Sequence, residues 1–456
     1  MNKEENNPSK CPICERPTHK ESKYCIFHAS AEDKTEEEFK NALKEYIQEI
    51  KEGDKDYNFK EFIFVGSANF KKDLNITVFK NARFDKTTFE RYANFRETTF
   101  KGDAVFKKAT FKGVTLFNKI TFEGCISFRE ATFEEDAVFK KITFQGHAVF
   151  REAIFKGVAF FQKTTFEGYA NFRESTFKGD AVFRQAIFKG DANFKLKYLV
   201  KIINFSRINV FSGKRLFIKL NNEGGKIYFV RAQLENTYLD IEIVEGISID
   251  FNGAILKDTK IKKDQIKNHI LQEKKKEYYK AQEIFLLLKN NFHSIGQYED
   301  ESWAFTKEKD MERKSYCHFK TLHRWLWSCF LNAIYGYGER PWNVAITAGV
   351  VILFFALFFS IIGIGNPEII EIKGTAIQQT SGNIVDLAFK GSIKNNVIRN
   401  FLDSLYFSTI TFTTLGYGDF RPLEGLGRIL AGSEAFIGAF MMALFVYTFA
   451  RRTGGR

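Results

Sequence analysis

The stretch ANFRETTFKGDAVFKKATFKGVTLF, residues 93–117, carries the pattern that decides the fold of the first half of the chain. Phenylalanine recurs in it at steps that alternate between five and six residues, and this alternation continues without a break from Phe95 to Phe194. A small or aliphatic residue stands two positions before each of these nineteen phenylalanines: twelve Ala, three Thr, three Ile and one Ser. Such regularity marks residues 59–194 as an internal repeat.

The A-x-F-x-x grammar of this repeat resembles that of pentapeptide-repeat proteins. The resemblance implies a right-handed, four-sided β-solenoid in which each phenylalanine and the small residue before it are stacked inside. The family repeat has five residues, whereas every second step here has six. We therefore prefer a coil of about 22 residues with a rise of about 4.8 Å over a flatter coil of about eleven residues. Residues 59–194 would then make about six coils, a rod roughly 30 Å long.

Glycine marks the six-residue steps of the repeat. It stands two positions after the phenylalanine in eight of them, and Glu135 is the one exception. We expect a corner with positive φ at this position, since glycine adopts that conformation most readily. Beyond Phe194 the spacing decays, and its remnants predict an irregular continuation, so that the solenoid covers residues 57–262. These remnants are Phe205, Phe211, Leu234, Leu239, Phe251, Leu256 and Ile261.

A zinc-binding motif is predicted within residues 1–30. Cys11 and Cys14 form one pair, and Cys25 and His28 form a second pair with the same spacing of two intervening residues. Three thiolates and one imidazole at this spacing are typical of a tetrahedral Zn²⁺ site. The expected Zn²⁺ is structural, because four protein ligands leave no open position for catalysis. Reduced thiols without a metal are the alternative.

An amphipathic capping helix is predicted within residues 31–56, over the stretch from Thr35 to Glu52. Thr35 and Glu38 suit a capping box at its start. Apolar residues recur on one face of the helix, and we expect this face to cover an exposed end of the solenoid. The apolar residues are Phe39, Leu43, Tyr46, Ile47 and Ile50.

Residues 263–335 change to a helical pattern, which predicts a helical hairpin linker followed by an interfacial helix. The hairpin consists of one helix from Lys263 to Asn291 and a second from about Glu299 to Ser315. It resembles a single hairpin of tetratricopeptide-like linkers, and we interpret it as a rigid connector. The segment from His318 to Tyr335 combines tryptophan, phenylalanine and arginine, a mixture that suits a helix lying at the membrane surface.

Two long apolar segments predict an all-α membrane domain over residues 336–456. Residues 342–364 carry no charged side chain over their 23 positions, and residues 426–450 form the second segment; both are long enough to span a bilayer as helices. Neither has regularly spaced arginines, so we expect no voltage-sensing helix. Between them, residues 400–413 form a short, semi-apolar segment of pore-helix length.

The stretch FTTLGYGD, residues 412–419, resembles the selectivity-filter signature of potassium channels, with leucine where valine is more common. The resemblance implies a filter over residues 414–418, in which the carbonyls of Thr414 to Tyr417 and the Thr414 hydroxyl replace the hydration shell of K⁺. Tyr417 would pack behind the pore and Asp419 would lie at its outer mouth. Two spans and one loop cannot surround an ion, so four subunits are expected to assemble. The filter residues are Thr413, Thr414, Leu415, Gly416, Tyr417, Gly418 and Asp419.

The second span carries the residues that we expect to control the inner end of the pore. Gly438 matches the hinge glycine of the same channel family, about twenty residues after the filter. Met442, Val446 and Ala450 follow at helical steps and would line the inner cavity and the gate. Glu434 is the one acidic residue inside a span. An intramembrane carboxylate suggests a functional role, and a hydrogen bond to the pore helix is an equal alternative.

Charge indicates where the chain lies and which partners it has. The formal net charge is +13, and residues 341–456 contribute only nine Lys or Arg against seven Asp or Glu. Positive residues precede the first span and follow the second, which predicts that both termini are cytoplasmic and that residues 365–425 face outward.

A second GYG triplet, Gly336–Gly338, follows no pore helix and is interpreted as a cytoplasmic linker. The N-terminus lacks the apolar core of a signal peptide.

These features together predict a tetrameric, potassium-selective ion channel in the plasma membrane, with a cytoplasmic pentapeptide-repeat domain that regulates it or serves as a scaffold. K⁺ is the permeant ion, and the expected partners are three further copies of the chain, the lipid bilayer and a protein bound to the solenoid. No nucleic-acid partner is expected, because the mixed, rather basic rod is a poor DNA mimic and no base-reading motif is present. We expect no enzyme activity, since no nucleophile–base pair or phosphate loop appears.

One expectation concerns how the domains cooperate, and a second concerns an alternative function. Since the chain stops at Arg456, shortly after the second span, gating input is expected to enter through the first span from the solenoid and the hairpin. The alternative function is a membrane-anchored pentapeptide-repeat scaffold whose pore is inert or poorly selective.

Overall fold

The computed structural model describes residues 10–199, 201–221, 224–316, 322–365, 396–422 and 425–453. The chain divides into two compact units, Met1–Met311 and Glu312–Arg456. The predicted ligands of the metal motif, the filter and the second span lie within the described residues. Cys317, His318, Lys320, most of the segment 365–425 and Arg456 lie outside the described residues, as do the predictions that concern them.

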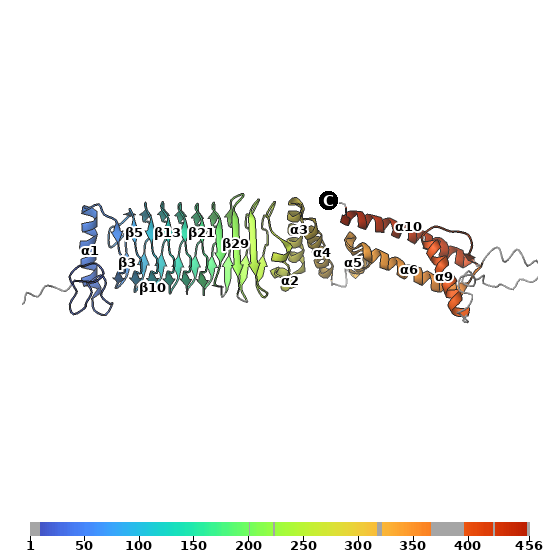
Figure 1. Ribbon diagram of the computed structural model, residues 1–456, viewed down its shortest axis with the longest axis horizontal. Helices are drawn as coiled ribbons and strands as arrows, with labels where there is room; N and C mark the ends of the chain where they lie inside the picture. The colour runs from blue at the N-terminus through green and yellow to red at the C-terminus, as the bar shows by residue number, and fades with distance from the viewer. Residues whose placement is uncertain are drawn as a thin grey trace, which may run out of the picture. The chain divides into compact units, whose positions relative to one another are not determined.

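The first unit is a β-solenoid with four faces, each formed by one parallel sheet (Figure 1). Strand β10 pairs with β14 so that Thr110 lies opposite Thr132, and this shift of 22 residues recurs through the regular part of the repeat. The 22-residue coil is therefore confirmed, and the eleven-residue alternative is wrong. Two of the sheets hold nine strands, so that the coils continue well beyond the regular repeat.

The strands of the four sheets have the following bounds. The first sheet runs β1-β5-β9-β13-β17-β21-β25-β29-β31, with bounds Tyr57–Asn58, Ala82–Arg83, Ala104–Val105, Ile126–Ser127, Ala148–Val149, Ala170–Asn171, Ala192–Lys195, Arg215–Leu220 and Tyr238–Ile243. The second runs β2-β6-β10-β14-β18-β22-β26, with bounds Ile63–Phe64, Thr88–Phe89, Thr110–Phe111, Thr132–Phe133, Ile154–Phe155, Thr176–Phe177 and Tyr198–Leu199. The third runs β3-β7-β11-β15-β19-β23-β27-β30-β32, with bounds Ala68–Asn69, Ala93–Asn94, Thr115–Leu116, Ala137–Val138, Ala159–Phe160, Ala181–Val182, Ile202–Asn204, Lys226–Tyr228 and Ser248–Asp250. The fourth runs β4-β8-β12-β16-β20-β24-β28, with bounds Val78–Phe79, Thr99–Phe100, Thr121–Phe122, Thr143–Phe144, Thr165–Phe166, Ile187–Phe188 and Asn209–Val210.

Stacked phenylalanine rings fill the interior of the solenoid. Phe150 and Phe172, one coil apart, have ring centroids 4.7 Å apart and planes that differ by 1°. The same Phe150 meets Phe161, on the opposite side of the interior, edge to face at 5.3 Å and 87°. Both arrangements suit the quadrupole of an aromatic ring. The small residues at the other inward positions, such as Ala159, are fully buried and leave room for the rings.

The glycines of the six-residue steps do not serve the purpose that the sequence suggested. None of these eight glycines has positive φ; instead, a Cβ at Gly146 would lie 2.5 Å from the carbonyl oxygen of Gly124 in the previous coil. Close contact between coils therefore favours glycine at these positions, although Glu135 shows that one coil accommodates a side chain. Positive φ occurs at the corners of the five-residue steps, where Lys141 (φ 55°) and Glu152 (φ 61°) are examples. The prediction of positive φ at the glycines is wrong, because the extra residue is accommodated without a left-handed turn.

Helical segments cover both ends of the solenoid within the first unit. Helix α1, Glu36–Glu52, begins with the predicted capping box of Thr35 and Glu38, and it buries Phe39, Leu43, Ile47 and Ile50 in one core with the first coil. The covering role predicted for this helix is confirmed. Tyr46 is only partly buried, and its hydroxyl donates a 2.6 Å hydrogen bond to the carbonyl of Asn58.

The other end of the solenoid differs from the prediction. A bridge between Ile249 and Ile270 continues the last coil, where one helix from Lys263 to Asn291 was expected. Asn268 and Lys276 have positive φ and interrupt any helix there. The helical spacing of buried isoleucines in this stretch reflects solenoid packing. The elements are the 3₁₀ helix η1, Lys263–Gln265, and helices α2, Leu271–Lys274, α3, Tyr278–Ser294, and α4, Tyr298–Ser315.

Helix α3 closes this end of the solenoid through polar and apolar contacts. The Asn291 side chain accepts a hydrogen bond from the Thr259 backbone amide and donates one to the Thr259 carbonyl, both at 2.9 Å. Phe285 and Phe292 of α3 are buried in the same core as the last coil. The hairpin is therefore part of the first unit up to Met311, and it acts as a cap for the solenoid.

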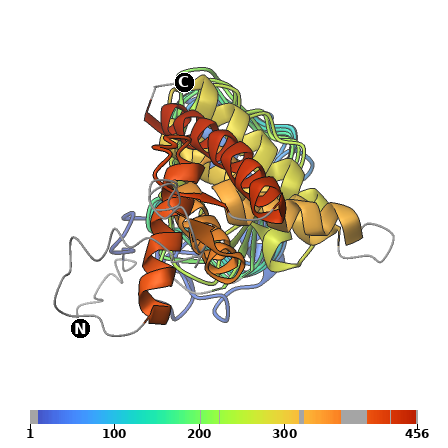
Figure 2. The ribbon, with the colours of Figure 1, turned by 90° about the vertical axis from the view of Figure 1, so that its right-hand side faces the viewer.

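The second unit is built from helices, three of which contact one another (Figure 2). The two candidate membrane spans are α6, Pro341–Ile362, and α10, Gly425–Thr453. Helix α9, Asn396–Phe412, lies against both. The remaining elements are α5, Leu322–Tyr335, the 3₁₀ helix η3, Gly336–Gly338, and the short antiparallel strands β33, Ile364–Gly365, and β34, Arg421–Pro422.

Candidate functional site

Helix α9 occupies the place of the predicted pore helix and ends directly before the filter stretch. Its residues Phe407 and Ile410 are buried with Phe355 and Phe359 of the first span, and Phe412 is buried with Met441 of the second. The helix is thereby held between both spans. The carbonyl end of a helix carries a partial negative charge, so a cation at the start of the filter stretch would be favoured electrostatically.

In the backbone after α9, every second residue from Thr414 to Gly418 has positive φ, which few residue types tolerate. Thr414, Gly416 and Gly418 have φ of 57°, 51° and 81°. Glycine adopts such angles freely, whereas threonine is β-branched and is strained there. The amides of Leu415 and Gly416 donate to the Ile410 carbonyl at 3.0 and 3.3 Å and end the helix. A strained residue at this position is a feature of functional sites.

The C-terminal end of the filter stretch is tied to helix α9. The Tyr406 hydroxyl of α9 donates a 2.9 Å hydrogen bond to Oδ2 of Asp419, and Oδ1 of Asp419 accepts from the amide of Phe420 at 3.1 Å. Phe420 is itself buried. The stretch from Thr414 to Asp419 is therefore anchored at both ends. Tyr406 was not identified from the sequence, and its spacing from Asp419 offered no signal without the fold.

The side chains in the middle of the filter stretch are uncovered in a single chain. Leu415 is 61% exposed and Tyr417 is 69% exposed. In the second span, Val446 is 65% exposed, and Met442 and Ala450 are exposed as well. Apolar and aromatic side chains left open in this way indicate surfaces that another molecule or lipid covers.

Gly438 and Glu434 of α10 both contact the pore helix. A Cβ at Gly438 would lie 1.9 Å from the carbonyl oxygen of Phe412, so α10 and the end of α9 approach each other at this glycine. Ser408 contacts the carboxylate of Glu434 and lies 2.8 Å from the carbonyl oxygen of Ile352. Of the two alternatives for Glu434, the structure therefore contains the hydrogen bond to the pore helix.

The second GYG triplet forms a structured connection between α5 and α6. Tyr337 has φ of 57° and is buried, and its hydroxyl donates to the Ser328 carbonyl at 3.0 Å. The next residue but one, Glu339, is 7% exposed and forms a 3.0 Å ion pair with Arg451 of α10. The connection therefore fastens the ends of the two spans. Sequence reasoning missed Glu339, because nothing in the local pattern pairs it with a residue so far along the chain.

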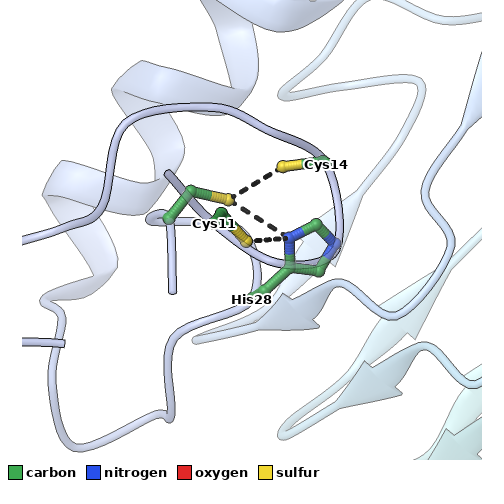
Figure 3. A group of neighbouring side chains, drawn as sticks. Cys11, Cys14 and His28 are labelled. Carbon is green, nitrogen blue, oxygen red and sulfur yellow. Dashed lines mark hydrogen bonds between the residues drawn. The ribbon is translucent and has the colours of Figure 1, made fainter. Parts of the chain in front are cut away.

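The four predicted metal ligands come together at the N-terminal end of the first unit (Figure 3). Their ligand atoms all lie within 4.8 Å of one another. Cys25 Sγ lies 3.1 Å from Nδ1 of His28 and 3.4 Å from Cys14 Sγ, and Cys11 Sγ lies 3.5 Å from the same Nδ1. Three sulfurs and one imidazole nitrogen at these distances are the donor set of a metal site with four protein ligands.

The surroundings of the cluster fit a bound cation. Nε2 of His28 lies 3.1 Å from the Lys60 carbonyl; since a carbonyl only accepts, Nε2 carries the proton and Nδ1 keeps its lone pair toward the sulfurs. Burial lowers the pKa of Lys34 to about 7, while the charge of Cys25 acts in the opposite direction. A divalent cation with three thiolates would have a net charge of −1, which would favour the charged form of Lys34.

The comparisons with known proteins match one family in each of the two units. Residues 370–454 match the family model described as ion channel, and residues 106–154 and 150–195 match the model described as pentapeptide repeats. The chain carries an ion-channel domain and a pentapeptide-repeat solenoid. The channel domain and two apolar helices, α6 and α10, mark the chain as a membrane protein.

Individual relatives match shorter or longer parts of the chain. Human potassium voltage-gated channel subfamily KQT member 4 is 46% identical over 50 residues, which is 11% of this chain and 7% of that protein. Protein LctB of Geobacillus stearothermophilus is 29% identical over 122 residues, 26% of this chain and 78% of that protein. The hyperpolarization-activated voltage-gated potassium channel of Methanocaldococcus jannaschii is 47% identical over 36 residues, 8% of this chain and 17% of that protein. The chain thus spans less than a tenth of the human relative. No solved structure matches the chain.

Proposed function

We propose that the chain forms a homotetrameric, potassium-selective channel in the plasma membrane, with the pentapeptide-repeat solenoid as a cytoplasmic regulatory or scaffold domain. The observation that carries this proposal is the filter stretch itself. Positive φ at Thr414, Gly416 and Gly418 follows the carbonyl end of α9 directly. Two of the relatives are named as potassium channels.

Ion selection is assigned to the main chain of Thr414 to Tyr417 and to the Thr414 hydroxyl. Carbonyl oxygens around a shared axis would replace the hydration shell of K⁺. One chain supplies only one side of such an axis. The exposure of Leu415 and Tyr417 in a single chain is consistent with this, because neighbouring subunits would cover them.

The inner end of the pore is assigned to the second span. Gly438 is proposed as the hinge, and Met442, Val446 and Ala450 as the lining of the inner cavity and gate. Gly438 lies so close to the Phe412 carbonyl that a side chain could not replace its hydrogen, and this contact limits how the proposed hinge could move. A bend at Gly438 would also shift the end of the pore helix, so that gate and filter would be mechanically coupled.

The membrane orientation is proposed from charge. Arg340 precedes the first span, and Arg451 and Arg452 end the second; this distribution of positive charge supports a cytoplasmic position for both termini. Helix α5 exposes Trp327 (60%) and Phe330 (53%), and we propose that it lies at the inner membrane surface.

The metal is proposed to be structural Zn²⁺, held by Cys11, Cys14, Cys25 and His28. Bound Zn²⁺ would cross-link two loops that have little core of their own. The motif is joined to the first coil through His28 and the Lys60 carbonyl, and through a 2.9 Å hydrogen bond from the Ile63 amide to the Phe27 carbonyl. Zn²⁺ would thereby stabilise the cap of the solenoid.

Ion flux into liposomes tests the channel function. Purified wild-type protein is expected to pass K⁺ in preference to Na⁺, and Gly416→Ala is expected to abolish this preference, because alanine is strained at φ 51°. Gly349→Ala in α6 is the control, since a Cβ there would have open space around it. Intact tetramers without K⁺ flux would favour the scaffold alternative, and a monomer in lipid would exclude both the filter and the tetramer.

A further inference from the structure

The five-residue corners of the solenoid form two columns that differ in how their charges are paired. One column lies between the first and second sheets, and the other lies between the third and fourth sheets, on the diagonally opposite edge. In both columns the corner residue has positive φ and repeats every 22 residues along the chain. The two columns therefore have the same backbone, and they differ in side chains.

In the first column, each charged corner has a partner. Glu130 pairs with Arg129 at 3.2 Å and with Lys108 at 3.3 Å. Glu152 pairs with Arg151 at 2.8 Å. Further pairs of this column join Arg173 to Glu174 at 3.9 Å, Lys195 to Glu174 at 3.3 Å and Lys86 to Glu61 at 2.9 Å. This corner is electrically neutralised within the chain.

The second column begins in the same way and then loses its acidic partners. Glu97 pairs with Lys71 at 2.8 Å and with Lys119 at 3.5 Å. Beyond Lys119 a set of cations follows that we name the basic corner. No ion pair joins these cations to another residue in the described part of the chain. The basic corner consists of Lys140, Lys141, Lys163, Arg184, Arg207 and Arg231.

Stacked like charges oppose folding, so the basic corner is not explained by stability. The amide of Lys141 donates to the carbonyl of Gln162 at 3.0 Å, and that of Lys163 donates to the carbonyl of Arg184 at 3.1 Å. These cations therefore stand on successive coils, about 4.8 Å apart. Like charges directly opposite each other repel, and a bound anion would relieve this repulsion.

The basic corner also holds a hollow of about 220 Å³. Four cations and two amides line it, and no carboxylate does. The guanidinium group and the side-chain amides are directional donors suited to phosphate oxygens, and the ammonium groups add charge. The lining residues are Lys140, Lys141, Gln162, Lys163, Arg184 and Gln185.

We propose that this hollow binds a soluble anion that carries a chain of phosphate groups. The cations of three successive coils span about 10 Å along the rod, which suits a row of phosphates better than one isolated group. The nearby Phe160 does not offer a platform for stacking a nucleic-acid base, because it is only partly exposed and Lys140 Nζ lies 4.6 Å from its ring centroid. The site does not depend on ion conduction.

Calorimetric titration of the full-length protein with inorganic tripolyphosphate tests this site. The variant Lys141→Gln/Lys163→Gln is expected to weaken binding at least about tenfold, because it removes two charge-assisted contacts. Glutamine is compatible with this corner, since Gln185 occupies the next position of the same column with φ 61°. Binding by the wild type is also expected to weaken as salt is raised.

The first column supplies a matched control. Lys86→Gln/Lys108→Gln removes the same charge at the same kind of corner, where φ is 55° and 59°, and less than about a twofold change is expected. Equal weakening in both variants would mean general attraction to a basic chain and would overturn the proposal. No tripolyphosphate binding by the wild type would overturn it too, as would binding only to phosphatidylserine vesicles, which would indicate a membrane surface.

Discussion

The solenoid completes its interior within one chain, whereas the pore unit leaves its central segment open. Phe161 of the solenoid is fully buried between rings of its own chain. Tyr417 of the filter stretch is 69% exposed. A coil is stabilised by the coil before it and the coil after it, and both ends of the solenoid are covered by α1 and α3. One unit is therefore stabilised by its own packing, while the other exposes apolar surface that lipid and, in the proposed tetramer, neighbouring subunits would cover.

The contrast extends to the apolar surfaces. Phe436 and Phe440 of α10 are 78% and 65% exposed, which would be unfavourable in water and is suitable against lipid or another helix. The outward positions of the solenoid carry ion pairs such as Lys112 with Glu90 at 2.8 Å. Substitutions inside the solenoid should therefore act on folding, and substitutions in the pore unit should act on assembly and flux.

The largest effect is expected in the solenoid interior. Phe161→Ala removes a ring that stacks on Phe183 at 4.7 Å, and we expect a loss of about 3–5 kcal/mol in the free energy of unfolding. Thermal unfolding followed by circular dichroism measures it. The neighbour Phe160 points outward and is the matched control, with an expected loss below about 1 kcal/mol. Equal losses at both positions would contradict the stacked interior.

In the pore unit, Gly438→Ala is expected to displace the end of α9. The added Cβ would overlap the Phe412 carbonyl oxygen, and we expect a loss of about 1–3 kcal/mol in stability together with a loss of K⁺ flux. Gly432→Ala in the same helix is the control, because a Cβ there meets nothing within 4 Å. If both variants conduct normally, the filter does not depend on this contact.

A smaller effect is expected at the ends of the two spans. Glu339→Gln weakens the ion pair with Arg451, and we expect a loss of about 1–2 kcal/mol and an altered open probability in single-channel recordings. The exchanged pair Glu339→Arg/Arg451→Glu should recover part of the loss if the pair itself is responsible. A double variant no better than the single ones would contradict this role.

The smallest effect concerns pH at the N-terminal cap. A hydrogen bond from the Thr35 amide and a contact with Lys20 lower the pKa of Glu38 to about 2. A carboxyl with a lowered pKa stabilises the folded state above its ordinary pKa of 4.5 and loses this contribution as pH falls toward about 2. Glu38→Gln should therefore flatten the fall of the thermal midpoint between about pH 5 and pH 3. Glu37→Gln, in the same first turn, should retain the wild-type slope.

Much of the architecture could be read from local pattern. The spacing of phenylalanine from Phe95 to Phe194 sets the solenoid, because only a coil of constant length keeps every ring inside. The spacing of Cys11, Cys14, Cys25 and His28 likewise predicted their convergence, since two short loops bring pairs of ligands together. In these cases neighbouring residues carry all the information that is needed.

The predictions were wrong where the conformation of a segment depends on backbone contacts with residues far away in the sequence. The helical spacing of isoleucines after Lys263 belongs to the last coil, because the coil before it offers a strand edge and Asn268 interrupts a helix. The sequence predicts left-handed corners at the glycines of the six-residue steps, whereas the close approach of Gly146 to Gly124 is what favours glycine there. Neither outcome can be recognised without the preceding coil in place.

The sequence by its local pattern predicted the repeat, the cluster of three cysteines and one histidine, the two apolar helices and the filter motif, since each is a pattern of near neighbours. The packing of separate elements sets which glycine touches Phe412, which serine meets Glu434 and which cations lack an acidic partner among the residues that the structure describes. These contacts join residues from separate elements, and their distances follow from how coils and helices pack. Packing is a property of the folded chain as a whole, so local spacing could not reveal it.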